Sequence, residues 1–255
     1  MDKLYHIGFG TGDLGDNPPT LAFLSGDPGR AERIARTHFT SVKELSTTRG
    51  LHSYLGELGG QKVLSSTSGM GAPSLSIIVN ELVQVGIKTI IRVGTCGSIQ
   101  PQVKAGSVVI SSGALCRQGA ANDIAPKEYP AVADPFWVVR LADAAQEVGA
   151  DYHVGITASV DTFYEGQGRT GGANPNLIRA QQGVVEEYVH LNVLNFEMEA
   201  GTLFKMGGVY GFSAACICAV IAQRNEAEAV QTDKKDAAVE QAIQVAIKAA
   251  QLSQD

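Results

Sequence analysis

Short apolar runs rich in β-branched residues alternate with segments of helical periodicity along this chain. Six of the runs are predicted to be strands: residues 20–24, 63–66, 89–93, 108–111, 154–158 and 212–222. Most of them are continuously apolar, which is typical of strands that are covered on both faces. Because strands and helices alternate, the chain is predicted to fold as one α/β domain over residues 1–255, with a largely buried sheet.

Segments between these runs carry apolar residues at helical spacing. Residues 73–85 begin with Pro-Ser and place Leu75, Ile78, Leu82 and Val85 on one stripe, as an amphipathic helix does. The other predicted helices are residues 30–36, 135–148 and 233–252. In α/β folds of this kind, ligands bind at the carboxyl ends of the strands, in the loops that follow them. Functional residues are therefore expected directly after the strands.

Charge and cysteine content exclude some functions. The net charge is −6, which argues against a protein that coats nucleic acid, so an anionic ligand would need a local arginine cluster. Cys96, Cys116, Cys216 and Cys218 lack the paired spacing of a zinc site and are expected to be small core residues in a reducing compartment. The sequence shows no secretory signal pattern and no apolar run of membrane-spanning length, so we expect a soluble cytoplasmic protein.

Two features suggest an anion-binding site. The segment "SGDPGR", residues 25–30, follows the first predicted strand and could present backbone N–H groups, a helix N-terminus and Arg30 to an anion; it could also be an ordinary strand-turn-helix connection. Arg92 lies inside a predicted strand, and a buried arginine needs an anionic partner. The partner is either a structural carboxylate or a bound phosphate, which the Thr95 hydroxyl in the expected loop 94–98 would help to hold.

Two further segments complete the candidate site. Glu197 and Glu199 in "EMEAG" would share a face if extended and could accept hydrogen bonds from vicinal sugar hydroxyls, or they could mark a helix start. The glycine-rich "FYEGQGRTGGA", residues 163–173, holds Gln167 and Arg169 two residues apart, and Arg224 follows the last predicted strand. Together these groups suit a substrate with an anionic reactant, a sugar diol and a planar polar head.

Five segments carry a family resemblance: "GDPGR", "GMGAPSLSI", "IRVGTCGSIQP", "ASVDTFYEGQGR" and "NFEMEAGTLF". In this order they resemble the nucleoside phosphorylases of the hexameric class, over the chain from His6 to about Arg224. The Phe-Tyr-x-Gly-Gln-x-Arg loop is similar to that of the branch that acts on uridine. The purine branch places a Ser-Asp pair after its last strand, where this chain has Gln223, Arg224 and Asn225.

The resemblance implies a three-layer α/β/α fold around a central mixed, partly barrel-like sheet. It implies reversible phosphorolysis of uridine to uracil and ribose 1-phosphate by a homo-hexamer built from dimers. The implied phosphate ligands are Gly26, Arg30, Arg92 and Thr95, with Arg49 reaching a neighbouring subunit's phosphate. The implied ribose ligands are Met198 and Glu199, with Glu197 close by and His6 acting across the subunit interface. The implied base pocket is Phe163, Gln167, Arg169 and Arg224. The implied catalytic residues are Arg30, Arg92, Glu199 and Arg224.

Breaking an N-glycosidic bond to uracil leaves negative charge on its two carbonyl oxygens, which glutamine and arginine donors can stabilise. Inorganic phosphate would be a co-substrate, and no cofactor or metal is expected. Related proteins with a monovalent cation site carry Glu where this chain has Gly50, so no potassium site is expected, although Ser74 matches another of its positions. Alternatives are purine or broad pyrimidine specificity, a nucleosidase that uses water, and a non-catalytic nucleoside-binding protein.

Overall fold

The computed structural model describes residues 2–224 and 232–253, within which nine strands form one sheet in the order β2-β3-β4-β1-β5-β8-β7-β6-β9. The strands are β1 Leu21–Ser25, β2 Thr40–Ser46, β3 Ser53–Leu58, β4 Gln61–Thr67, β5 Thr89–Ser98, β6 Val108–Arg117, β7 Tyr152–Val160, β8 Asn195–Glu197 and β9 Ser213–Gln223. The helices are α1 Pro28–His38, α2 Ala72–Gln84, α3 Gly119–Ile124, α4 Pro135–Glu147, α5 Val184–His190, α6 Ala200–Tyr210 and α7 Thr232–Leu252.

Part of the sheet closes into a barrel. Strand β5 pairs with β8 on one side and with β9 on the other, so β5, β8, β7, β6 and β9 form a closed ring. The ring is mixed, because β5 runs parallel to β9 but antiparallel to β8. The outer strands β1, β4, β3 and β2 extend the sheet beyond β5. The predicted mixed, partly barrel-like sheet is therefore confirmed.

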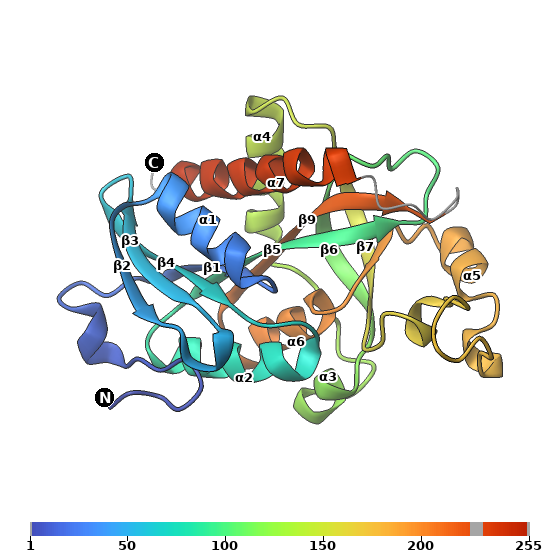
Figure 1. The fold of residues 1–255 in the computed structure, drawn as a ribbon, viewed down its shortest axis with the longest axis horizontal. Coiled ribbons are helices and arrows are strands. Elements are labelled where there is room, and N and C mark those ends of the chain that lie inside the picture. The colour runs from blue at the N-terminus through green and yellow to red at the C-terminus, as the bar shows by residue number, and fades with distance from the viewer. Residues whose placement is uncertain (1, 225–231, 254–255) are drawn as a thin grey trace.

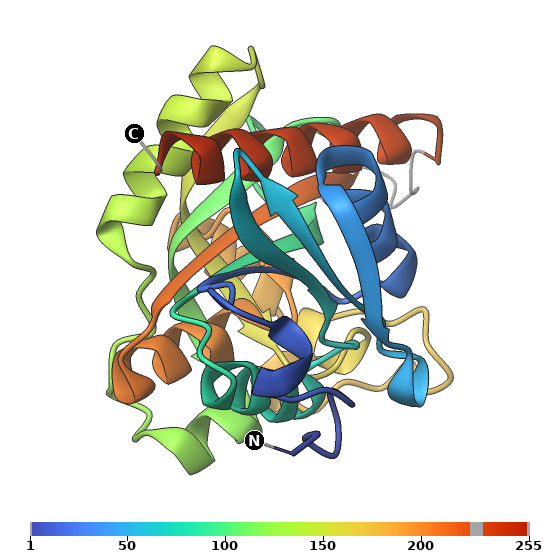
Figure 2. The same cartoon turned by 90° about the vertical axis from the view of Figure 1, so that its left-hand side faces the viewer.

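Helices cover the sheet on two sides, in the predicted three layers. Figure 1 shows α1, α4 and α7 on one side and α2, α3 and α6 on the other, and Figure 2 shows the same layers from the left-hand side of that view. Neighbouring residues of β5 pack against the helices on opposite sides of the sheet. Ile90 packs in the cluster that includes Leu75 of α2 and Leu203 of α6, whereas Ile91 packs in the cluster that includes Leu141 of α4 and Ile243 of α7.

The four predicted helices are present, and short polar signals set where two of them begin. The Asp27 carboxylate accepts a hydrogen bond from the Arg30 backbone N–H, and Pro28 follows at the first position of α1. Asp134 caps α4 in the same way, because its carboxylate accepts from the N–H groups of Phe136 and Trp137. Both are standard N-cap arrangements, which satisfy donors that lack a partner inside the helix.

The six predicted strands are present, but two of them were predicted too short: β6 continues from the predicted end at Ser111 to Arg117, and β5 continues beyond Val93. Residues 94–98, expected to be a loop, continue β5 as far as Ser98, because they pair with β9 and β8 around the closed barrel. Strands β2, β3 and β8 and helices α3, α5 and α6 were not predicted. Cys96, Cys216 and Cys218 are buried as expected, and all four cysteines are free thiols. Among the described residues, no helix has both the length and the apolar character needed to cross a membrane.

Candidate active site

A cavity of about 800 Å³ lies where the loops after β1, β4 and β7 meet the ends of β5, β8 and β9. The cavity brings together nearly all of the residues predicted from the sequence for one chain: Gly26, Arg30, Arg92, Thr95, Phe163, Gln167, Arg169, Glu197, Met198, Glu199 and Arg224. Thr95 lines the cavity from within β5 instead of from a loop. These residues come from segments that are up to two hundred positions apart, so the barrel is what assembles the site.

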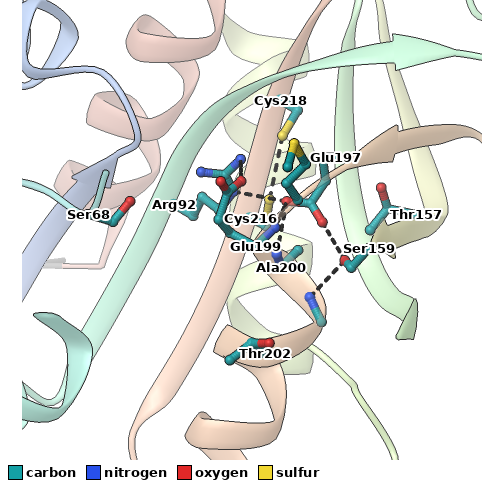
Figure 3. Close-up of polar contacts among 12 residues, drawn as sticks. Ser68, Arg92, Thr157, Ser159, Glu197, Glu199, Ala200, Thr202, Cys216 and Cys218 are labelled. Carbon is teal, nitrogen blue, oxygen red and sulfur yellow. Dashed lines mark hydrogen bonds and ion pairs between the residues drawn. The ribbon is translucent and has the colours of Figure 1, made fainter. Parts of the chain in front are cut away.

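Arg92 is the most deeply buried cation of the cavity. Its side chain on β5 is 4% exposed, and its Nη2 lies 2.5 Å from Glu199 Oε2 while its Nε lies 3.2 Å from Glu197 Oε2. Figure 3 shows both carboxylates turned toward the guanidinium. Of the two partners expected for a buried arginine, the structure therefore shows the carboxylate. The pKa of Arg92 is raised well above its usual value, because the two glutamates outweigh the opposing effect of burial.

Glu197 and Glu199 occupy different elements. Glu197 ends β8 and Glu199 is the N-cap of α6, so the segment is both the end of a strand and the start of a helix. Oε2 of Glu197 accepts hydrogen bonds from the backbone N–H groups of Glu199 and Ala200, each at 2.8 Å, and its Oε1 accepts from the Ser159 hydroxyl. Burial and the charge of Glu199 raise the pKa of Glu197 to about 7, against the opposing effects of Arg92 and Ser159.

Arg30 approaches the same region from the first turn of α1. Its Nη1 donates to the Val93 carbonyl oxygen at 3.2 Å, but its Nε is buried and has no hydrogen-bond partner among the described residues. Burial lowers the pKa of Arg30, and the charge of Arg92 lowers it further. A buried donor without a partner beside a second cation is costly for the protein alone. An anion in this position would relieve both costs, which is the chemistry predicted for "SGDPGR".

The loop after β7 supplies a polar group of a different kind. Arg169 stacks over the Phe163 ring with 3.8 Å between its Cζ and the ring centroid, and its Nη1 donates to the Gln167 side-chain oxygen. Arg224 donates from Nη1 to the Gln167 carbonyl at 2.7 Å and lies over the Phe196 ring. The loop is held by a 3₁₀ turn, Glu165–Gln167, that ends at Gly168. A side chain at Gly168 would be strained, because its φ is +70° and a Cβ would lie 2.8 Å from Val184.

Three residues of the site were not assigned from the sequence. Gly71, in the glycine-rich loop after β4, donates its N–H to Glu199 Oε1 at 2.5 Å. Ser159 contacts Glu197, and Gln118 donates from Nε2 to the Met198 carbonyl at 2.5 Å. Gly71 has a φ of +87°, a conformation that favours glycine. The glycine in the quoted segment "GMGAPSLSI" was therefore a sequence signal for this close approach. Ser159 lies in the quoted segment "ASVDTFYEGQGR", but nothing in that segment indicates that its hydroxyl contacts an acid. Gln118 carried no signal, because a lone Gln has no distinguishing pattern until the fold places it beside a carbonyl.

His6 and Arg49 lie outside this cavity. The His6 Nδ1 is 2.6 Å from Glu81 Oε1 and faces a second, smaller cavity beside α2. Arg49 Nη2 donates to the Tyr5 hydroxyl at 2.9 Å. Both had been assigned to a neighbouring subunit's site, and that assignment stays a prediction. Asn225, named with Gln223 and Arg224 at the exit of the last strand, lies outside the described residues.

The fold and the site together define a class: an α/β protein with a closed mixed barrel, whose cavity combines the buried Arg92 and the half-buried Arg30 with a polar glycine-rich loop. The chain belongs to the Phosphorylase superfamily, whose family model matches residues 20–254.

Curated relatives match over nearly the full chain. The uridine phosphorylase of Haemophilus influenzae is 39% identical over 257 residues, which cover 98% of each chain. The uridine phosphorylase of Escherichia coli is 38% identical and covers 97% of this chain and 96% of its own. The uridine phosphorylase of Thermococcus kodakarensis is 37% identical and covers 92% of this chain and 83% of its own. The predicted family is therefore confirmed.

Proposed function

We propose that this chain is a uridine phosphorylase, which cleaves uridine reversibly with inorganic phosphate to give uracil and ribose 1-phosphate. The observation that carries the proposal is the cavity itself. It places Arg30, with a buried Nε that lacks a partner among the described residues, in the same space as Gln167 and Arg169. An anion cradle and a planar polar recognition loop in one cavity suit the two substrates of such a reaction, and curated relatives of this length bear that name.

In the proposed reaction, a phosphate oxygen forms a bond to the anomeric carbon of the ribose as the bond from that carbon to uracil N1 breaks. The bonding electrons leave with uracil, whose negative charge spreads onto its carbonyl oxygens before a proton arrives from solvent. Arg30, Arg92 and Thr95 hold phosphate, and Glu199 accepts hydrogen bonds from the ribose hydroxyls beside Met198. Donors aimed at charge that develops in the transition state accelerate such a step more than donors to the ground state do.

The base end of the proposed site is the glycine-rich loop. Gln167 offers a donor and an acceptor to one edge of uracil, and Arg224 stabilises charge on the departing base. Phe163, 49% exposed at the cavity, packs against the flat ring. A carboxylic acid at this end is unnecessary, because uracil leaves with its charge on oxygen atoms that these donors can reach.

We further propose that the enzyme works in the cytoplasm as a homo-hexamer built from dimers. His6 and Arg49 lie away from the cavity of their own chain, which suits a contribution to a neighbour's ribose and phosphate. The free state of all four cysteines suits a reducing compartment.

An ultraviolet assay tests the proposed function. Purified protein is incubated with uridine or inosine, with and without inorganic phosphate, and base release is followed. Uracil should appear only with uridine and only when phosphate is present. Cleavage of uridine without phosphate would indicate a nucleosidase instead, and faster cleavage of inosine than of uridine would overturn the assigned base specificity.

A further inference from the structure

Ser159 on β7 is fully buried and makes a hydrogen bond whose direction the structure fixes. Its Oγ accepts from the backbone N–H of Gly201 at 2.8 Å, so its own hydrogen is available for the carboxylate of Glu197, with which it is in contact. The approach depends on glycine, because a Cβ on residue 201 would lie 2.9 Å from Ser159 Cβ. The start of α6 is therefore held against β7 so that the serine hydroxyl points at one glutamate (Figure 3).

Glu197 uses both carboxylate oxygens on the protein. Oε1 accepts from Ser159, while Oε2 accepts two backbone N–H groups at the start of α6 and the Nε of Arg92. Its side chain is 0% exposed, whereas that of Glu199 is 6% exposed. A carboxylate with this many internal donors has little capacity left for sugar hydroxyls. Glu199 is the better placed of the two for a ligand.

We propose that Ser159 and Glu197 are positioning residues: the Ser159 hydroxyl fixes the Glu197 carboxylate, and Glu197 fixes the guanidinium of Arg92 in the orientation that receives phosphate. The inference rests on the proposed function in that it takes the anion to be phosphate. It reassigns Glu197 from the ribose ligands to the support of the anion cradle.

The planar shape of the arginine side chain explains why Arg92 needs a residue that orients it. The guanidinium is planar, and its donors point in fixed directions within that plane. A bond from Nε to Glu197 sets the plane, and with it the directions of both Nη groups. Without that bond, Glu199 would be the carboxylate left to Arg92 among the described residues, and the proposed reaction needs Glu199 for the ribose. The hydrogen bonds from Ser159 to Glu197 and from Glu197 to Arg92 therefore leave Glu197 to orient the arginine and Glu199 to bind the sugar.

Phosphate binding by calorimetry tests the inference without any turnover. Ser159→Ala should raise the dissociation constant of inorganic phosphate about tenfold, the effect of losing one hydrogen bond to a charged group. In the uridine assay, the KM for phosphate should rise far more than the KM for uridine. Ser159→Cys has a side chain of similar size, but its thiol is a weak hydrogen-bond donor, so this variant should also bind phosphate more weakly than the wild type. It replaces the alanine variant if that variant fails to fold.

Thr157→Val is the matched control. Thr157 is also fully buried on β7, two residues earlier, and its hydroxyl donates to the Asn195 carbonyl at 3.4 Å instead of to Glu197. This variant should lose some thermal stability and keep the phosphate affinity of the wild type. Equal loss of phosphate affinity in the two variants, or an unchanged affinity in Ser159→Ala, would overturn the inference.

A double-mutant cycle identifies the residue through which Ser159 acts. Glu197→Gln keeps the shape of the side chain and removes its charge. If Ser159 acts through Glu197, Ser159→Ala should weaken phosphate binding much less in the Glu197→Gln background than in the wild type. Strict additivity would contradict the chain of contacts. Wild-type protein that binds phosphate but leaves uridine intact would overturn the proposed function alone.

Discussion

Arg30 and Arg92, the two arginines proposed to hold phosphate, differ in what they contribute to the stability of the folded protein, so their roles can be separated experimentally. Arg92 is the counter-ion of Glu197 and Glu199, so Arg92→Met should lower the free energy of unfolding by about 3 kcal/mol or more. Arg30→Met removes a cation whose Nε has no partner among the described residues and should leave stability nearly unchanged. Both variants should lower kcat/KM for phosphate by 30-fold or more, on a loss of about 2–4 kcal/mol.

Urea unfolding and a phosphate titration of the initial rate provide the two measurements. Retained phosphate affinity in Arg30→Met would show that Arg30 does not bind phosphate. An Arg92→Met protein as stable as the wild type would show that the two glutamates do not need their counter-ion.

Gln167 is a base-reading residue under the proposed function. Gln167→Ala should lower kcat/KM for uridine about tenfold or more, on a loss of about 1.5–3 kcal/mol, because a site built for specific hydrogen bonds is left with unpaired groups. Activity on inosine, where it is measurable, should fall much less. The melting temperature should stay close to that of the wild type. A parallel loss on both substrates together with a lower melting temperature would mean that Gln167 only braces the loop through its contacts with Arg169 and Arg224.

Glu197 predicts a pH dependence of stability. Its pKa is raised from 4.5 to about 7 in the folded protein, so between these values the folded state keeps a proton that the unfolded chain has released. The contribution is therefore complete below pH 4.5 and is lost as the pH rises toward 7. The free energy of unfolding of the wild type should fall more steeply over this window than that of Glu197→Gln. Urea unfolding at a fixed protein concentration measures both curves, and parallel curves would contradict the shift.

At the scale of elements, helix caps are where sequence and stability connect most directly. Asp134 caps α4 and also accepts from the Ser213 hydroxyl at 2.7 Å, and it does not line the active-site cavity. Asp134→Ala should cost about 1–2 kcal/mol and lower the melting temperature by a few degrees, with kcat/KM for uridine unchanged. Asp134→Asn, which keeps a capping oxygen, should recover most of the loss. An unchanged melting temperature in the alanine variant would show that water satisfies these donors equally well.

Elements with strong local patterns could be predicted from the sequence, and those defined by tertiary pairing could not. Strand β9 is recognisable in the sequence as a continuous apolar run, and helix α2 as an apolar stripe at helical spacing. Strand β8 is three residues long and exists because Phe196 and Glu197 find partners on β5 and β7. Strand β2 is mostly exposed and polar, so no periodicity marks it.

The candidate site divides in the same way. Arg92 could be found from the sequence because an arginine inside an apolar run is unusual. The loop of Gln167 could be found because so many glycines in one short segment are also unusual. The partnership of Arg92 with two glutamates more than a hundred residues away could not be found, since spacing in the sequence carries no information about it. The expectation that ligand residues follow their strands failed for Thr95, because barrel closure extends β5 through that position.

At the scale of the whole molecule, the proposed shared sites predict complementation. Arg49→Ala and Arg92→Ala proteins should each be nearly inactive alone, because every site lacks one phosphate ligand. Subunits that are mixed, dissociated and reassembled should regain part of the wild-type activity, since some hybrid sites take Arg92 from one chain and Arg49 from the other. Activity is compared before and after mixing, with each variant taken through the same cycle alone as the control. An active monomer at assay concentration would contradict shared sites.

Closure of the barrel also determines which strand of the sheet is left with an unpaired edge, where another sheet could add and start aggregation. Strands in the ring have partners on both sides, so the sheet ends at β2, the outermost strand of the order within the described residues. That strand carries Lys43 and Glu44 and has irregular register with β3 on either side of them. Charges and irregular pairing on an edge strand discourage the edge-to-edge stacking that leads to aggregates. Within the described residues, the strand that ends the sheet is therefore a poor template for fibrils.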